Sequence, residues 1–281
     1  MSHIFDKAVV FVIAVLVCLL PQAYAKSPPP GTGKADVPAN ILFMVDTSGS
    51  MSAMASSSNT TRYPLDVAID SQGNVYVVEL QYQRIKKFDA NGNFVKQWGR
   101  YGGRNGQFNS PYRIAIDSND NVYVSDYGNS RVQKFDTNGT WLQNFSVNYP
   151  VALDVDSSGN VYVGAYQRNQ IVKFDSSGSE VKRWSSRSPW GLSVRDGNVY
   201  VAEFHNHRIT KFTTDGVSVG SWYVYYPIDV EATAYGIYVL SLYQHRVYHY
   251  SATGRLQRSW GGCCRGNYRL YYPYGLGSDS A

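Results

Sequence analysis

Residues 120–139 read DNVYVSDYGNSRVQKFDTNG, and close relatives of this stretch recur along the chain. A proline precedes each unit, at Pro64, Pro111, Pro150, Pro189, Pro227 and Pro273. An aromatic residue follows the first five prolines at a nearly fixed distance, at Phe88, Phe135, Phe174, Phe212 and Tyr250. A second follows ten residues later, at Trp98, Phe145, Trp184, Trp222 and Trp260. Because five units agree at the same positions, the sequence predicts an internal repeat of about 40 residues.

Each unit divides into four short segments that are typical of β-strands. In the second unit they are YRIAID, NVYVSD, RVQKFD and WLQNF, which are rich in β-branched and aromatic residues. Turn-forming pairs such as Gly73-Asn74 and Asn91-Gly92 separate such segments. Repeated four-stranded units predict an all-β fold, a β-propeller whose recurring Phe and Trp side chains pack between neighbouring blades. The first strands of the blades are expected near residues 66–70, 113–117, 152–156, 191–194 and 228–231.

The stretch GQFNSPYRIAIDSNDNVYVSDYGNSRVQKFD, residues 106–136, resembles the NHL repeat in its Gly-Gln-Phe lead-in and its third strand. The resemblance extends over residues 63–281 and implies a propeller that usually has six blades. Here five units are complete, and the sixth, which ends in PYGLGSDSA, is truncated. A strand expected at residues 41–46 could cover part of the gap, although it does not match the repeat.

The first 25 residues are typical of a secretory signal peptide. Lys7 precedes the apolar run AVVFVIAVLVCLL, and the small residues Ala23 and Ala25, on either side of Tyr24, supply a cleavage site after Ala25. The following residues, 26–40, are rich in Pro and Gly and are expected to form a linker. The mature chain is therefore expected to have no transmembrane span and to be extracytoplasmic, as a secreted, periplasmic or cell-surface protein.

Residues 41–62 carry a second resemblance. The run ILFMV is followed by Asp46, Ser48 and Ser50, which resemble the metal-ion-dependent adhesion site of von Willebrand factor A domains, as at the start of bacterial pilus-tip adhesins. That resemblance implies hard oxygen ligands for a divalent cation. However, an A domain needs far more sequence than this, so a cation is expected only if the domain is completed elsewhere, and no other cofactor is expected. The alternative is an ordinary strand followed by a Ser-rich linker.

The candidate ligand site consists of loop and channel positions at which the residue differs from one blade to the next, because the function of a propeller lies in its loops and channel. Charged residues occupy the position two residues after three prolines, at the expected channel mouth: Asp66, Arg113 and Asp229. Aromatic residues occupy three of the loops between second and third strands: Tyr127, Tyr166 and Phe204. Internal ion pairing of the charges and simple packing of the loops are the alternatives.

Other recurring groups are interpreted as structural. An arginine begins the third strand of most units, with an acidic residue five positions earlier in three of them, which predicts an ion pair within each blade. Gln170 replaces the arginine in the third unit. His205, His207 and His245 are expected in outer loops. Cys263 and Cys264 are adjacent and are the only cysteines behind the signal segment.

Three classes of function compete. The preferred one is a non-catalytic interaction module that binds protein, peptide or glycan, in the context of adhesion or a pilus. An extracytoplasmic lyase or hydrolase is the alternative, although no cluster of catalytic residue types is visible and the protein is not expected to be an enzyme. An RNA-binding or ubiquitin-ligase-associated role is disfavoured, because the sequence has no RING or B-box cysteines and its signal peptide points out of the cytoplasm. A net charge of +5 over 281 residues is mild, and no nucleic acid is expected.

Overall fold

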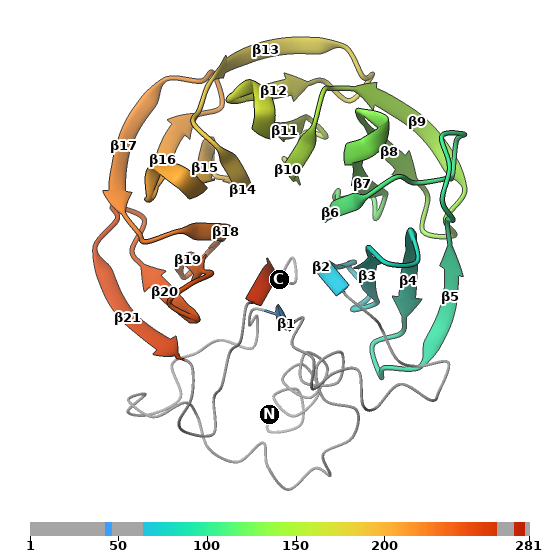
Figure 1. Ribbon diagram of the computed structural model, residues 1–281, viewed down its shortest axis with the longest axis horizontal. Helices are drawn as coiled ribbons and strands as arrows, with labels where there is room; N and C mark the ends of the chain where they lie inside the picture. Colours follow the sequence, from blue (N-terminus) through green and yellow to red (C-terminus); the bar gives the residue numbers. More distant parts are fainter. Residues whose placement is uncertain (1–42, 47–63, 263–272, 279–281) are drawn as a thin grey trace, which may run out of the picture.

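The computed structural model describes residues 43–46, 64–262 and 273–278. Within these ranges, five four-stranded antiparallel sheets stand around a central axis (Figure 1). The four strands of each sheet are paired in chain order, with the first strand next to the axis. The predicted all-β propeller, with five complete NHL-like blades, is therefore confirmed.

The strands have the following bounds. Blade 1 holds β2 (Pro64–Ile69), β3 (Val75–Glu79), β4 (Arg84–Phe88) and β5 (Phe94–Trp98). Blade 2 holds β6 (Pro111–Ile116), β7 (Val122–Asp126), β8 (Arg131–Phe135) and β9 (Trp141–Ser146). Blade 3 holds β10 (Pro150–Val155), β11 (Val161–Ala165), β12 (Gln170–Phe174) and β13 (Glu180–Ser185). Blade 4 holds β14 (Pro189–Arg195), β15 (Asn198–Glu203), β16 (Arg208–Thr213) and β17 (Ser218–Tyr223). Blade 5 holds β18 (Pro227–Thr233), β19 (Gly236–Ser241), β20 (Arg246–Tyr250) and β21 (Leu256–Gly261). Each first strand begins at its proline, one or two residues earlier than predicted.

Apolar side chains from facing sheets form the core between blades. Between blades 2 and 3, for example, Tyr123 and Phe145 of one sheet pack with Leu153 and Phe174 of the next. The five aromatic residues predicted to lie on the third strand of each blade are all buried. The buried residues form separate clusters, most of them between neighbouring sheets, so each blade is stabilised by the blades beside it.

The turn between the third and fourth strands also packs on the preceding blade. In blade 4 this turn contains Gly216, which has φ +79° and lies against the indole of Trp184 in blade 3. A Cβ at Gly216 would lie only 2.7 Å from that ring. Gly139 and Gly254 meet Trp98 and Trp222 in the same way. Glycine is thus required at this turn position for two reasons: the backbone is left-handed, and the tryptophan ring leaves no room for a Cβ.

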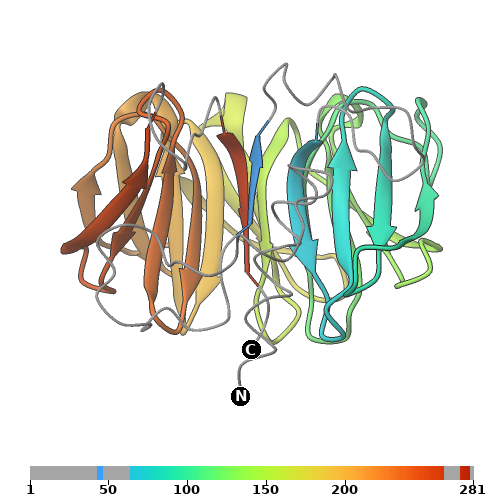
Figure 2. The same cartoon turned by 90° about the horizontal axis from the view of Figure 1, so that it is seen from below.

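The sixth position of the ring holds a two-stranded sheet. It consists of β22 (Pro273–Gly277), which has the place of an inner strand, and β1 (Phe43–Asp46), which pairs with it antiparallel. β22 lies between β2 and β18, and Figure 2 shows it beside β1 near the middle of the disc. The strand predicted at residues 41–46 is observed at Phe43–Asp46, where it pairs with β22 and covers part of the predicted gap.

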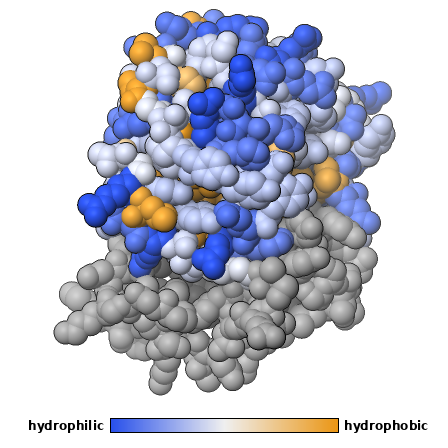
Figure 3. All heavy atoms as spheres, turned by 60° about the vertical axis from the view of Figure 1, so that its left-hand side comes forward, coloured by the Kyte–Doolittle hydropathy of each residue, from blue (hydrophilic) through white to orange (hydrophobic). Residues whose placement is uncertain are grey.

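The flank of the disc is mainly hydrophilic. Figure 3 shows the side on which β17 and β21 lie, with only small and separate apolar spots. Among the described residues, no helix has the length and apolar character to cross a membrane. The predicted signal segment and linker, Ser48, Ser50, Cys263 and Cys264 lie outside the described residues.

Candidate functional site

Two sets of turns meet on one face of the ring, which we call the mouth face. The short 3-10 turns η3 (Tyr127–Asn129), η4 (Tyr166–Arg168) and η5 (Phe204–Asn206) follow the second strands of blades 2, 3 and 4. The first residue of each turn donates its backbone N–H to the carbonyl just before the proline of the same blade, as Tyr166 N does to Tyr149 O at 3.1 Å. The turns and the links between blades therefore form one fixed surface around the channel.

Aromatic rings cover much of this face over blades 2 and 3. The ring centroid of Tyr127 lies 5.3 Å from that of Tyr112 and 5.6 Å from that of Tyr149. Gln167 of blade 3 donates a 2.7 Å hydrogen bond to the Tyr127 hydroxyl. This bond connects the ring group of blade 2 to the turn of blade 3.

A second aromatic group continues over blades 3, 4 and 5. Tyr166 lies 4.8 Å from Trp190, and Trp190 lies 5.2 Å from Phe204, measured between ring centroids. Phe204 contacts Tyr226 at 5.0 Å, and Tyr226 contacts Tyr243 at 4.7 Å. Most of these contacts are tilted or edge-to-face, the arrangements that the ring quadrupoles favour. The two groups together are called the aromatic collar below.

Beneath the collar, the channel is crossed by one arginine. The Arg113 guanidinium lies 3.1 Å from Asp229 and 3.4 Å from Asp66, measured between nitrogen and carboxylate oxygen. It also donates hydrogen bonds of 2.9 Å to Ile228 O and 3.0 Å to Tyr274 O. One side chain from blade 2 thus contacts blade 1, blade 5 and β22.

The charges at the channel mouth are almost fully enclosed. Asp66, Arg113 and Asp229 expose only 4–5% of their surface. Burial raises the pKa of Asp66 to about 7 in spite of the nearby Arg113, and it raises the pKa of Asp229 as well. One cation between two carboxylates compensates one negative charge, so the second carboxylate tends to hold a proton.

Carboxylates along the channel join neighbouring inner strands. Asp66 accepts a 2.9 Å hydrogen bond from Ile114 N in the next blade, and Asp229 accepts one of 2.7 Å from Leu276 N. Asp154 of blade 3 accepts a 2.6 Å bond from Val194 N of blade 4. These bonds satisfy strand N–H groups that no adjacent strand reaches. A cavity of about 220 Å³ between the inner strands contains Asp66, Arg113, Asp154 and Asp229 in its wall.

The predicted site residues are thus found in two layers. Tyr127, Tyr166 and Phe204 lie in the collar, as predicted for the loops between second and third strands, with Phe204 buried and the two tyrosines half-buried. Asp66, Arg113 and Asp229 lie in the channel below and are engaged with one another and with backbone groups. Their contact with a ligand stays a prediction. The partial metal motif cannot be assembled from described residues, since of its three positions only Asp46 falls in a described strand.

The sequence did not reveal five of the eight rings in the collar. The missed rings are Tyr112, Tyr149, Trp190, Tyr226 and Tyr243. Four of them lie directly before or after the proline that begins a blade. That adjacency is the signal that could have revealed them, because the links between blades and the second-to-third-strand turns meet on the same face.

The predicted ion pairs within blades are confirmed in blades 1, 2 and 4: Glu79–Arg84, Asp126–Arg131 and Glu203–Arg208. Two of the histidines belong to the mouth face. His205 shares a 3.1 Å hydrogen bond with the Tyr166 hydroxyl, and His207 Nδ1 accepts one of 3.2 Å from Tyr226 N. In the described part of the chain, no group of three or more His, Cys, Asp or Glu residues is arranged to hold a metal ion.

The family model of the NHL repeat matches residues 108–135 and 187–212. These stretches lie mainly in blades 2 and 4, so the chain contains NHL repeats, as its resemblance to them predicted. No curated protein sequence matches the chain. The comparisons give no support to the resemblance of residues 41–51 to a von Willebrand factor A domain.

Several solved structures share the fold. A chain in the crystal structure of a nidogen/laminin complex aligns with a TM-score of 0.64 and 17% identity, over 76% of this chain and 84% of that one. A streptogramin B lyase aligns with a TM-score of 0.61 and 11% identity, over 79% and 73%. The virginiamycin B lyase from Staphylococcus aureus aligns with a TM-score of 0.60 and 11% identity, over 83% and 77%. At such low identities the likeness shows the fold alone.

Proposed function

We propose that the protein is an extracytoplasmic, non-catalytic binding module whose aromatic collar takes a protein or peptide partner. The observation that carries this proposal is the run of ring contacts across blades 2 to 5. Tyrosine and tryptophan are enriched among the residues that dominate binding energy at protein interfaces. The expected location outside the cytoplasm rests on the signal peptide that the first 25 residues predict.

The collar is suited to binding because its rings are already held in place. Backbone hydrogen bonds fix the turns, and each ring packs against a neighbour, so little conformational freedom remains to be lost on binding. Phe204 is buried beneath Tyr226 and Tyr243 and supports them. Tyr243, which exposes 49% of its surface, is the ring most available to a partner.

Arg113 and its carboxylates have an indirect role in this proposal. They hold five inner strands or links together under the collar and keep the spacing of the rings constant. The partner would contact the aromatic rings directly. The charge of the Arg113 cluster, which lies beneath the rings, would act on the partner electrostatically without direct contact. An adhesive or pilus-associated partner is one case within this proposal.

A non-catalytic function is consistent with the engagement of the histidines. His205 and His207 serve as hydrogen-bond partners of Tyr166 and Tyr226 within the collar. The fold also occurs in the nidogen/laminin complex, where it takes part in an assembly of two proteins. The engagement of the histidines therefore supports the choice of a binding surface, while the shared fold fits either kind of function.

The test compares two exposed tyrosines that differ only in their face. Tyr243 lies in the collar, whereas Tyr235 lies in the turn between β18 and β19 at the opposite end of blade 5, and each exposes 49% of its surface. Binding to cell-surface protein fractions and to a glycan array is measured for wild type, Tyr243→Ala and Tyr235→Ala. We expect Tyr243→Ala to weaken protein binding by about 1–3 kcal/mol and Tyr235→Ala to leave it unchanged.

Three outcomes would contradict the proposal. Equal binding by both variants, or loss only in Tyr235→Ala, would show that the collar is not the binding face. Binding to the glycan array alone would assign the collar to sugars rather than to a protein.

A further inference from the structure

Blade 3 departs from the other blades at one ion pair. In blades 1, 2 and 4, an acidic residue ends the second strand and an arginine begins the third: Glu79–Arg84, Asp126–Arg131 and Glu203–Arg208. The paired residues at these positions in blade 3 are Ala165 and Gln170. In blade 5 the acid is replaced by Ser241, whose hydroxyl donates to Tyr225 O at 2.6 Å. Blade 3 alone has an apolar side chain here.

In blades 2 and 4 the acidic residue at the end of the second strand makes a further hydrogen bond. Its carboxylate also accepts the backbone N–H found two residues before the proline: Asn109 N to Asp126 at 2.7 Å, and Arg187 N to Glu203 at 3.0 Å. The corresponding donor in blade 3 is Asn148 N. It finds no hydrogen-bond acceptor among the residues that the structure describes.

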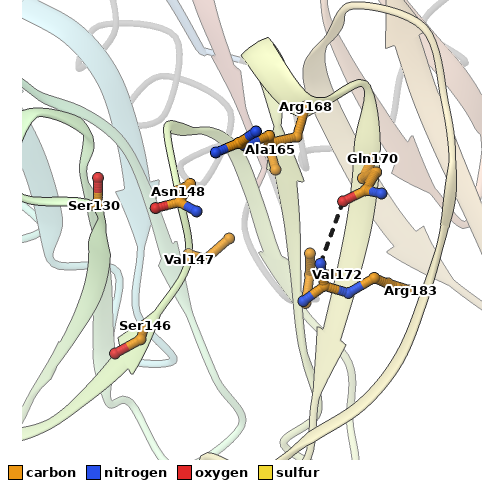
Figure 4. Close-up of a pocket in the computed structure, with 9 residues that line it drawn as sticks. All are labelled: Ser130, Ser146, Val147, Asn148, Ala165, Arg168, Gln170, Val172 and Arg183. Carbon is orange, nitrogen blue, oxygen red and sulfur yellow. Dashed lines mark hydrogen bonds between the residues drawn. The ribbon is translucent and has the colours of Figure 1, made fainter.

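A cavity of about 420 Å³ occupies the place of the missing pair (Figure 4). Ala165, Val147 and Val172 contribute apolar wall, and polar groups surround them. The Arg168 side chain extends over Ala165 in the direction of Asn148. This volume is within the range of small-molecule pockets.

The cavity carries an unbalanced positive charge. Arg183 forms two hydrogen bonds to the Glu180 carboxylate, at 2.6 and 2.5 Å, so its charge is compensated. Arg168, by contrast, has no ion pair or hydrogen bond from its side chain to any described residue. Gln170 adds an amide to the wall beside Arg183, whose Nη1 donates to its Oε1 at 3.4 Å.

We propose that this cavity binds a small organic carboxylate, whose carboxylate group takes the place that the Asp126 or Glu203 side chain has in the neighbouring blades. Arg168 and Asn148 N would donate to the carboxylate, and the apolar wall would receive the body of the ligand. A guanidinium matches the two oxygens of a carboxylate, and the repeat itself shows that a carboxylate fits here. The site lies between blades 2 and 3; Arg168 ends the η4 turn that begins with Tyr166, but the cavity wall contains none of the collar rings.

The ligand could be a free acid or the terminal carboxylate of a peptide, and the experiment separates these sources. Calorimetric titration of the full chain uses acetate, D-glucuronate and a pentapeptide with a free C-terminus, at constant ionic strength. D-glucose and the same pentapeptide with an amidated C-terminus are the matched controls that lack the carboxylate. We expect saturable binding of at least one carboxylate and no response to these two controls.

Variants locate the binding. Arg168→Ala is expected to weaken it about tenfold or more, because a hydrogen-bonded charge pair is lost. Lys182→Ala removes the same charge from a residue outside the cavity and is expected to change affinity less than about twofold. The double variant Ala165→Glu/Gln170→Arg restores the pair of blade 4, fills the cavity and is expected to abolish binding while the thermal midpoint stays or rises.

The proposal is wrong if none of the carboxylates binds the wild type. It is also wrong if the double variant binds as the wild type does, or if Arg168→Ala and Lys182→Ala have equal effects.

Discussion

The guanidinium of Arg113 in blade 2 lies 3.1 Å from the carboxylate of Asp229 in blade 5, across the centre of the ring. These blades are not neighbours, so the pair spans the channel rather than an interface between adjacent sheets. Asp66 of blade 1 completes the cluster from a third direction. A single cation therefore balances carboxylates that would otherwise repel one another in a site with little water.

Arg113→Met should destabilise the propeller by about 2–4 kcal/mol at pH 8, because it leaves two buried carboxylates without a cation. The loss should be smaller at pH 5, where Asp66 and Asp229 take up protons more readily. Urea unfolding at both pH values measures the change in the free energy of unfolding. The triple variant Asp66→Asn/Arg113→Met/Asp229→Asn should recover part of the loss, and a loss independent of pH would contradict this account.

Asp154→Asn should flatten the dependence of stability on pH. Burial raises the pKa of Asp154 in the folded protein to about 7, above its ordinary value of 3.8. The folded state therefore holds this proton more tightly than the unfolded state, and its contribution to the free energy of unfolding falls as pH rises from about 4 to about 7. Between pH 5 and pH 8 the variant should gain about 2–3 kcal/mol relative to wild type. Asp196→Asn, at a side chain that is 85% exposed, should keep the wild-type slope.

Gly216→Ala should lower the free energy of unfolding by about 1–3 kcal/mol, since the new Cβ meets the Trp184 indole and the residue has a left-handed φ. Gly220→Ala in β17 is the matched control, because a Cβ there has no neighbour within 4 Å and φ is not left-handed. Its effect should stay within about 0.5 kcal/mol. Equal effects of the two substitutions, seen in chemical denaturation, would show that the contact with tryptophan is unimportant.

Proline substitutions in β1 test whether this strand closes the ring. Met44 and Val45 pair with Leu276 and Gly275 of β22. A proline within the ladder removes an N–H donor and, where that donor is bonded, a ladder hydrogen bond. Met44→Pro or Val45→Pro should therefore increase hydrogen exchange in β22 and in β2 next to it, while exchange in β11 stays as in wild type. Unchanged exchange in β22 would mean that β1 contributes little.

The sequence revealed those parts of the fold that depend on local spacing. The aromatic residues equivalent to Phe88, the turn glycines and ion pairs like Glu203–Arg208 recur in successive repeats. Each of these features depends on residues that are close together in the chain, so agreement among the repeats is enough to predict it. Internal ion pairing of Asp66, Arg113 and Asp229 was one of the alternatives left open by the sequence, and the structure shows it. The geometry of the cluster could not be derived, because its partners come together only when distant inner strands converge. Asp66 and Asp229 were recognised as charges near the axis, yet the sequence does not show that one arginine serves both.

The candidate site was partly recognised for the same reason. Tyr127 and Tyr166 stand out as aromatic residues in equivalent turns. Trp190 and Tyr226 do not, because their place beside a proline has no meaning until the turns are seen to bond to the links between blades. The loss of the ion pair at Gln170 is visible in the sequence, but the cavity that replaces it is not.

The pairing of β1 with β22 sets an order of events along the folding pathway. Each of blades 1 to 5 is a meander of adjacent strands that can form as soon as about 40 residues are available. The last sheet, in contrast, joins the two ends of the described chain, and closing a loop of roughly 200 residues costs about 5 kcal/mol of chain entropy. Inner strands and channel carboxylates would stay open to water until that step. Ring closure is therefore expected to be the slow, final event, and a protease or chaperone would encounter an open arc of blades before it encounters a disc.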